Sequence, residues 1–172
     1  MKILKSNEII LDDIKKISKN CKSEISFLSG KNVLFTGAAG FIGYLFIQLL
    51  NSIGADNNCE KVNIFMLDNF IRGKKKWIQD IENHPNVNLI NCDITKDFSF
   101  STSFDYIIHA ASIASPTFYR KFPIETIDAN VFGLRNLLDL CLKQKQRGKS
   151  VKGFLFFSSS EIYGDPTPNE IP

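Results

Sequence analysis

The chain has 172 residues, a length that fits one domain able to bury roughly two-thirds or more of its unfolded surface. Hydrophobic residues make up 44% and charged residues 23%, and fifteen phenylalanines indicate a well-filled apolar core. The formal charge of +3 is too small to favour nucleic acid or an anionic membrane as a partner.

The sequence also argues against a membrane-spanning segment, a secretion signal and a metal site. Its apolar runs are shorter than the roughly 18–20 residues of a membrane span, and residues 1–20 lack the apolar stretch of a secretion signal. The four cysteines are widely spaced and are interpreted as reduced thiols, so a cytoplasmic location is expected. The two histidines have no ligand partner at motif spacing, and no metal site is expected.

The first predicted element is a short helix over 6–20 with isoleucines on one face. It precedes the main pattern, so residues 1–30 are predicted to be a helical extension that packs against a domain over 31–172. In chain order, this domain is predicted as strand 33–35, helix 41–53, strand 62–67, helix 74–83, strands 87–90 and 106–109, helix 124–144 and strand 154–157. The alternation predicts an α/β fold, a Rossmann-type doubly wound parallel sheet with helices on both faces.

The helix predicted over 124–144 carries apolar residues at steps of three and four, which form a stripe along one side. A subunit interface and an intradomain core both need this periodicity. The pattern therefore leaves the two alternatives open.

The segment NVLFTGAAGFIG places Gly37, Gly40 and Gly43 after a strand and at the opening of a helix. Glycines at this spacing permit a tight turn, let the backbone approach a pyrophosphate and let the helix pack closely on the strand. The helix N-terminus adds free N–H groups and the positive end of its dipole. Because the strand comes before the glycines and the helix after them, a dinucleotide site is predicted.

The second strand ends in Asp68, where a carboxylate can accept hydrogen bonds from both hydroxyls of an adenosine ribose and repel a 2′-phosphate. This position favours NAD over NADP, although an aspartate at a strand end also serves as a loop or helix cap. The basic segment 72–76 contains Arg72 and three lysines, and it keeps NADP open as a second possibility.

The motifs GAAGFIG, LDNF, CDI, DYIIHAAS and FSSSEIYGD follow one another in the order of the extended short-chain dehydrogenases/reductases. Over about 31–165, the chain resembles the NAD-dependent nucleotide-sugar epimerases, dehydratases and decarboxylases of that group. The resemblance implies NAD as cofactor and a nucleotide sugar, in the first place a UDP-sugar, as substrate. It also implies oxidation at C4, chemistry on the ketone and a homodimer built through the helix over 124–144.

The same resemblance, together with the glycine pattern, assigns the cofactor site. The implied cofactor-binding residues are Gly37, Gly40, Phe41, Ile42, Gly43, Asp68, Asn69, Asp93, Ile94, Ala110 and Ser112. Those in 37–43 would form the pyrophosphate turn, and Asp68 with Asn69 would hold the adenosine ribose. Asp93 with Ile94 would contact the adenine, and Ala110 with Ser112 would border the nicotinamide.

A finer pattern, HAASIASPTFYRKFPIETIDANVFGLRNLL, is similar to UDP-glucuronate decarboxylases and implies that Ser115 and Asn136 bind the nucleotide sugar. Asp128 and Ala129 depart from it, because those decarboxylases usually place Lys and Thr there. An acidic residue at this point disfavours a carboxylated sugar. The layout of the whole segment still makes decarboxylation of UDP-glucuronate the first expectation, with C4 epimerisation the second and 4,6-dehydration the third.

The segment after the last strand supplies the implied catalytic residues. By resemblance, Ser159 hydrogen-bonds the reacting hydroxyl of the sugar, and Glu161 transfers a proton at C5 or positions the ring. Ser160 stands where dehydratases place an aspartate, and serine is a poor proton donor, which disfavours loss of water. Serines after a strand also commonly satisfy backbone groups, and Glu161 equally fits a solvated position.

The base of the family is a tyrosine whose pKa is lowered by a lysine four residues later. None of the four tyrosines in this chain has a lysine at that spacing. The chain is therefore expected to be the N-terminal part of such an enzyme, truncated before the substrate-binding part. This N-terminal part is expected to bind NAD but not to convert substrate. A non-catalytic NAD-binding module is the alternative from another class.

Overall fold

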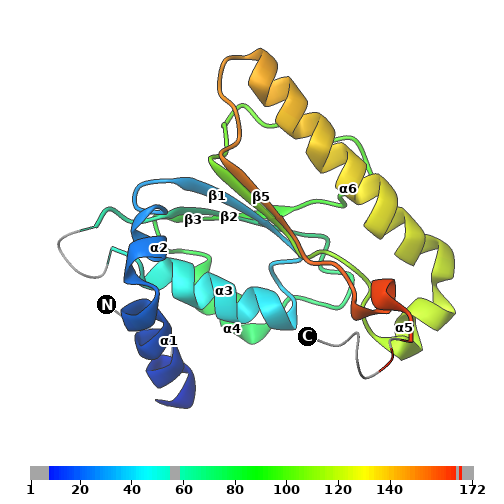
Figure 1. Cartoon of the computed structure of the whole chain (residues 1–172), viewed down its shortest axis with the longest axis horizontal. Coiled ribbons are helices and arrows are strands. Elements are labelled where there is room, and N and C mark those ends of the chain that lie inside the picture. Colours follow the sequence, from blue (N-terminus) through cyan, green and yellow to red (C-terminus); the bar gives the residue numbers. More distant parts are fainter. Residues whose placement is uncertain (1–7, 55–58, 166, 168–172) are drawn as a thin grey trace.

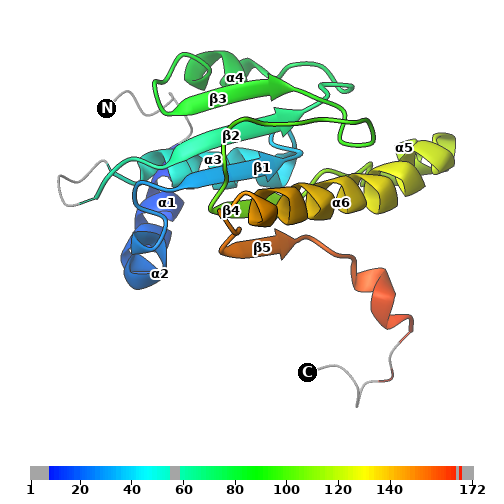
Figure 2. The same cartoon turned by 90° about the horizontal axis from the view of Figure 1, so that it is seen from above.

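One parallel sheet of five strands organises the chain, with the strands in the order β3-β2-β1-β4-β5. The structure is a computed structural model that describes residues 8–54, 59–165 and 167. The strands are β1 (Asn32–Thr36), β2 (Asn63–Asp68), β3 (Val87–Asn91), β4 (Tyr106–His109) and β5 (Gly153–Phe156). Figure 2 shows them side by side in this order. Because the chain order reverses at β1, the switch point of the doubly wound sheet lies between β1 and β4.

Helices cover both faces of the sheet. They are α1 (Glu8–Asn20), α2 (Lys22–Ser26), α3 (Phe41–Ser52), α4 (Lys76–Ile81), α5 (Pro116–Lys121), α6 (Pro123–Gln146) and the 3-10 helix η1 (Ser160–Tyr163). In Figure 1, α3 and α4 lie below the sheet and α6 lies on its other side. In the part of the chain that the structure describes, no helix is long and apolar enough to cross a membrane.

The alternation of side chains along β1 shows why both faces need a cover. Val33 and Phe35 pack in one cluster with Ile47 of α3, whereas Leu34 packs in a second cluster with Leu137 of α6. All five side chains are fully buried. Fully burying each contributes about 1.5–3 kcal/mol. The predicted Rossmann-type sheet with helices on both faces is confirmed.

Several element boundaries differ from those predicted. The helix predicted over 74–83 is the shorter α4, and the strand predicted over 154–157 begins and ends one residue earlier as β5. Two helices, α2 and α5, were not predicted, because neither is long enough to show a helical period. Pro116 stands in the first turn of α5 and Pro123 in the first turn of α6, where a proline needs no N–H partner. Residues 6–7 of the first predicted helix lie outside the described residues.

The two edges of the sheet differ. At one edge, β3 carries Asn88 and Asn91. At the other edge, β5 pairs only with β4, and its Leu155 and Phe156 are 48% and 41% exposed in the described structure. The side chains exposed at the β3 edge are thus polar, and those exposed at the β5 edge are apolar.

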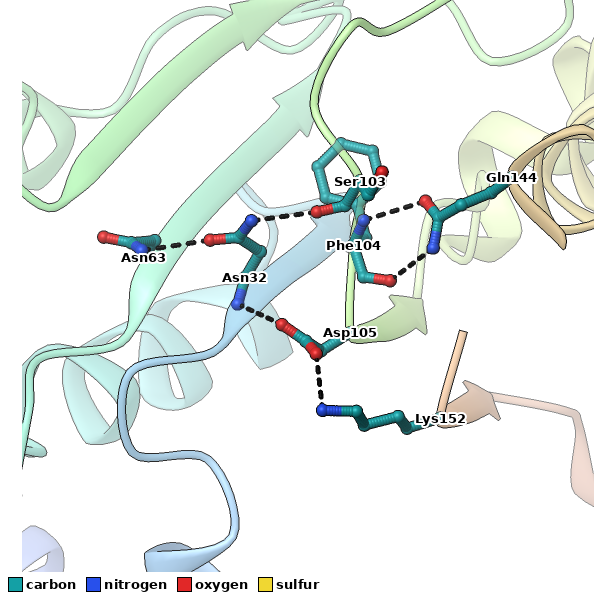
Figure 3. A network of polar contacts seen from close by, with 7 residues as sticks. All are labelled: Asn32, Asn63, Ser103, Phe104, Asp105, Gln144 and Lys152. Carbon is teal, nitrogen blue, oxygen red and sulfur yellow. Dashed lines mark hydrogen bonds and ion pairs between the residues drawn. The ribbon is translucent and has the colours of Figure 1, made fainter. Parts of the chain in front are cut away.

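A polar network joins the amino ends of β1, β4 and β5 (Figure 3). Asp105 Oδ2 accepts a hydrogen bond from the Asn32 backbone N–H at 3.0 Å, and Oδ1 contacts Lys152 Nζ at 2.8 Å. Burial raises the pKa of Asp105, but the hydrogen bonds from Lys152 and Asn32 outweigh it and hold this pKa below its usual value. One carboxylate therefore ties together the starts of three strands.

The side chain of Gln144 fastens α6 to the same end of the sheet. Its Oε1 accepts from the Phe104 backbone N–H at 2.8 Å, and its Nε2 donates to the Phe104 carbonyl at 2.6 Å (Figure 3). Both residues are buried. The amide thus pairs with Phe104 as a neighbouring strand would, just before β4 begins.

Candidate functional site

The glycine turn after β1 leaves no room for a side chain at Gly37. This residue has a φ of 70°, and a Cβ atom there would lie 2.7 Å from the carbonyl oxygen of Ala110. The N–H groups of Gly37 and Ala38 donate to the Leu67 carbonyl at 2.9 and 3.3 Å. The turn is therefore fixed between the carboxyl ends of β2 and β4.

The other two glycines shape the start of α3. Gly40 is the N-cap, and no side chain in the described part of the chain caps the helix. The first-turn N–H groups of a helix have no partners within it, so they can receive an anion. A Cβ atom on Gly43 would lie 2.3 Å from the Ala38 carbonyl oxygen, which shows how closely α3 packs on the turn. The turn has the geometry of a pyrophosphate-binding turn.

A cavity of about 610 Å³ opens at the carboxyl ends of the strands. This size is typical of a small-molecule site. Most of the predicted cofactor residues line it: Gly37, Gly40, Phe41, Asp68, Asn69, Asp93, Ile94, Ala110 and Ser112. Gly43 packs against Ala38 and does not line the cavity, and Ile42, also outside its lining, is partly exposed.

Asp68 holds two loops at the edge of this cavity. Its Oδ2 accepts from the Ala39 N–H at 3.0 Å, and its Oδ1 accepts from the Phe70 N–H at 2.8 Å. A carboxylate offers about four acceptor positions, so further hydrogen bonds remain possible. The capping role and a ribose-binding role are therefore compatible at this residue.

Asp93 follows β3 and organises the next part of the wall. Its Oδ1 accepts from both the N–H and the hydroxyl of Thr95, at 3.0 and 2.8 Å. Burial, followed by the charge of Asp93, raises the pKa of the neighbouring Cys92 thiol, which keeps it neutral. All four cysteines are free. Within the described residues, no group of three His, Cys, Asp or Glu side chains is placed to hold a metal.

The predicted catalytic pair lies outside the cavity lining. Ser159 Oγ accepts from the Glu161 N–H at 3.2 Å and so caps η1. Both residues are exposed. The hydrogen bond is the backbone-satisfying role considered for these serines, and the catalytic role of the pair stays a prediction.

The two predicted substrate residues also lie elsewhere. Ser115 is the N-cap of α5. Asn136 Nδ2 donates to the carbonyls of Ile94 and Lys96, at 2.8 and 3.3 Å, and so ties α6 to the loop after β3. The sugar contacts predicted for Ser115 and Asn136 stay predictions.

The cavity has an aromatic wall that the sequence did not predict. Tyr44 and Trp77 both line it, and their rings meet edge to face with centroids 5.0 Å apart. Tyr44 stands four residues after Gly40, on the same side of α3, which is a signal that could have found it. Trp77 comes from α4, and nothing in its local sequence points to the cavity. Glu125 of α6 was missed as well.

His109 is buried beneath the turn, with 1% of its surface exposed. Its Nδ1 lies 2.8 Å from Thr36 Oγ1, and that oxygen accepts from the Ala111 N–H at 3.4 Å. Which of Nδ1 and Oγ1 donates depends on the tautomer of the ring, and among the described residues the buried Nε2 has no hydrogen-bond partner. Burial lowers the pKa of His109 to about 4.

This burial predicts a loss of stability in acid. The unfolded chain binds a proton at His109 near pH 6.5, while the folded chain does so only near pH 4, so stability falls as the pH drops through this window. At pH 5, we expect about 2 kcal/mol less free energy of unfolding than at pH 7.5. Urea unfolding at a series of pH values measures it. His109→Asn should flatten the decline and His84→Gln should not; an unchanged decline in His109→Asn would contradict the assignment.

Comparisons with known proteins agree with this geometry. Residues 33–172 match the NAD dependent epimerase/dehydratase family. UDP-glucuronic acid decarboxylase 6 of Arabidopsis thaliana is 36% identical over 141 residues, which cover 81% of this chain and 37% of that relative. UDP-glucuronic acid decarboxylase 1 of Danio rerio is 34% identical over 145 residues, covering 83% of this chain and 31% of that protein. The chain thus spans less than half the length of these relatives.

Solved structures share the fold. A UDP-N-acetylglucosamine 4-epimerase from Methanobrevibacter ruminantium M1 superposes with a TM-score of 0.62 at 23% identity, over 84% of this chain and 43% of that one. A double mutant of a dTDP-glucose 4,6-dehydratase from Streptomyces venezuelae, solved with NAD, superposes with a TM-score of 0.63 at 21% identity. The match covers 78% of this chain and 41% of that one. The glycine turn, the open helix N-terminus and the cavity all fit a dinucleotide. The chain therefore belongs to the NAD dependent epimerase/dehydratase family, and NAD is the cofactor that its turn and cavity fit.

Proposed function

We propose that this chain is the cofactor-binding part of a nucleotide-sugar enzyme that oxidises C4 of UDP-glucuronate and decarboxylates the product. The observation that carries the proposal is the glycine turn, which faces a cavity at the switch point of the sheet. The decarboxylase relatives support the choice of reaction. When bound, NAD would accept the hydride from C4.

The residues of the chain have distinct proposed tasks. The turn and the N-terminus of α3 hold the pyrophosphate, and Asp68 with Asn69 holds the adenosine ribose. The Phe157 N–H donates to the His109 carbonyl at 3.0 Å, so the chain after β5 runs beside the end of β4. Ser159 follows two residues later, and we assign it the hydrogen bond to the reacting hydroxyl of the sugar.

A second candidate is C4 epimerisation of a neutral nucleotide sugar. Glu125 and Asp128, near the start of α6, both line the cavity. Two carboxylates there repel the carboxylate of a glucuronate and leave a neutral sugar unaffected. Among the cations that line the cavity, Arg72 and Lys75 come from the segment after β2 and Lys96 from the loop after β3.

Binding of NAD tests the cofactor assignment. We expect Asp68→Ala to weaken NAD binding roughly tenfold to hundredfold, because a charged hydrogen-bond acceptor for the ribose is lost. Isothermal titration calorimetry on the 172-residue chain measures this. Asp68→Asn keeps the shape and one of the two acceptor oxygens, so it should also weaken binding but lower the unfolding temperature less than Asp68→Ala, which leaves both the Ala39 and the Phe70 N–H without their acceptor. Equal NAD affinity in all three proteins would remove Asp68 from the site.

The same chain should bind NAD without converting a sugar. A neutral phenol with a pKa near 10 is a poor base at neutral pH, and no tyrosine here has a lysine four residues later. Incubation with NAD and UDP-glucuronate, UDP-glucose or dTDP-glucose should yield no NADH and no altered sugar. Turnover above background would refute this and require another base. Products made by a longer version carrying a tyrosine–lysine pair would separate an enzyme from a non-catalytic NAD-binding module.

The outer side of α6 supports the proposed homodimer. Gly133, Leu137 and Leu140 face the core, but other apolar residues of the helix are about half exposed. This exposed set is Ile124, Ile127, Val131, Phe132, Leu138 and Leu142. We expect Val131→Glu to shift the mass measured by light scattering from dimer to monomer, and Lys143→Glu, an exposed position on another side of α6, to leave it unchanged. A strictly monomeric wild type would overturn the dimer, which, like the cytoplasmic location, is a prediction.

A further inference from the structure

The loop after β2 is held in one shape. Phe70 has a φ of 51° and is the one non-glycine residue with a positive φ in the described part of the chain. Such a conformation costs about 1–3 kcal/mol and persists only where the surroundings impose it. Here the Phe70 N–H donates to Asp68 at 2.8 Å, and the Gly73 N–H donates to the Phe70 carbonyl at 2.8 Å. The strained loop carries Arg72 between these two fixed points.

Arg72 lines the cavity and reaches across to another element. Its Cζ atom lies 5.0 Å from the ring centre of Phe118, which belongs to α5. A guanidinium that stacks on a ring keeps its N–H groups available in its own plane. Among the described residues, no acceptor forms a hydrogen bond with this guanidinium. Arg72 is thus positioned at the cavity with its donors unused.

The neighbouring lysines are placed differently. Lys75 also lines the cavity. Lys74 pairs with Glu82, and Lys76 starts α4 without lining the cavity. Among the carboxylates that line the cavity, Asp68 and Asp93 are the nearest to Arg72 in sequence, and both already accept hydrogen bonds from backbone N–H groups. The segment 72–76 therefore offers the cavity two cations, Arg72 and Lys75.

We propose that Arg72, supported by Lys75, binds a phosphate group of the dinucleotide. The inference rests on the proposed function and adds a subsite on the loop after β2 to the one formed by the glycine turn. A planar guanidinium gives two parallel N–H groups to phosphate oxygens. The same chemistry suits the pyrophosphate, which NAD and NADP share, and the 2′-phosphate, which only NADP carries. Because Asp68 repels a 2′-phosphate, the pyrophosphate is the expected partner.

Calorimetric titration of NAD and NADP into the 172-residue chain tests the subsite. Arg72→Gln should weaken binding of both nucleotides roughly tenfold to hundredfold, the range for a charge-assisted hydrogen bond. Arg72→Lys keeps the charge without the planar fork and should recover part of this loss. Lys76→Gln removes one charge from the same segment outside the cavity and should leave both affinities unchanged. Without nucleotide, Arg72→Gln should unfold at the wild-type temperature, since the side chain is exposed.

Each outcome has one meaning. Equal losses for NAD and NADP in Arg72→Gln identify the pyrophosphate, and a loss confined to NADP identifies the 2′-phosphate. If Arg72→Gln leaves the affinity for both nucleotides unchanged, the subsite is overturned and the proposed function stands. The same holds if Lys76→Gln weakens binding as much as Arg72→Gln does. If Arg72→Gln is unstable, Phe118→Leu, which removes the stacking ring, should weaken binding instead. A wild type that binds neither nucleotide overturns the proposed function, and the subsite with it.

Discussion

Gly37→Ala is expected to lower the free energy of unfolding by about 3 kcal/mol and to abolish NAD binding. The φ of 70° costs a residue with a Cβ atom about 1–2 kcal/mol. The new methyl group would also lie 2.7 Å from the Ala110 carbonyl oxygen and the Ala111 Cα, and overpacking adds about 1–3 kcal/mol. Both contacts are with backbone atoms, which cannot rotate away, so β1 and β4 must separate. Urea unfolding and calorimetry measure the two effects.

Gly148→Ala is the matched control for this substitution. Gly148 has a φ of 79°, but a Cβ atom there meets nothing within 4 Å. This variant therefore carries the conformational cost alone, about 1–2 kcal/mol, and should bind NAD normally. Equal stability of the two variants would mean that the close approach of β4 to the turn does not restrict position 37.

Gln144→Leu is expected to cost about 3 kcal/mol of unfolding free energy, because two buried backbone groups lose their partners. The Phe104 N–H and carbonyl both bond to the Gln144 amide, and Phe104 is 1% exposed, so water cannot replace them. Leucine has a similar volume, so the loss measures the hydrogen bonds rather than a cavity. Chemical unfolding gives the value.

The neighbouring glutamine serves as the control. Gln146 lies in the last turn of the same helix and is exposed, so Gln146→Ala should change stability by less than about 0.5 kcal/mol. A cost below about 1 kcal/mol for Gln144→Leu would show that the Phe104 groups find other partners.

The strands and the glycine turn were predictable because each depends on a local pattern. A parallel sheet covered on both faces requires continuous apolar runs, and all five predicted runs are strands in the structure. The turn requires glycine at particular positions, since only glycine fits the φ of Gly37 and the approach of α3 at Gly43. Where a backbone constraint selects one residue type, the sequence carries the signal.

The walls of the cavity could not be predicted in the same way. Trp77 and Glu125 reach the cavity from helices whose placement depends on tertiary packing. Asn136 carried a family-based role in sugar binding, yet its amide bonds to the loop after β3, a contact between residues about forty apart in sequence. The stripe on α6 has the same period whether it faces the core or solvent, so exposure had to come from the structure.

The apolar edge of the sheet has a consequence for handling the protein in solution. Within residues 8–54, 59–165 and 167, no strand pairs with the outer side of β5, so its N–H and carbonyl groups face outward next to the exposed Leu155 and Phe156. Such an edge can template strands of other molecules and seed aggregates. Concentrated samples of the 172-residue chain should therefore precipitate on storage at a rate that rises with concentration. Leu155→Lys should slow this precipitation, because it places a charge where an incoming strand would have to pair.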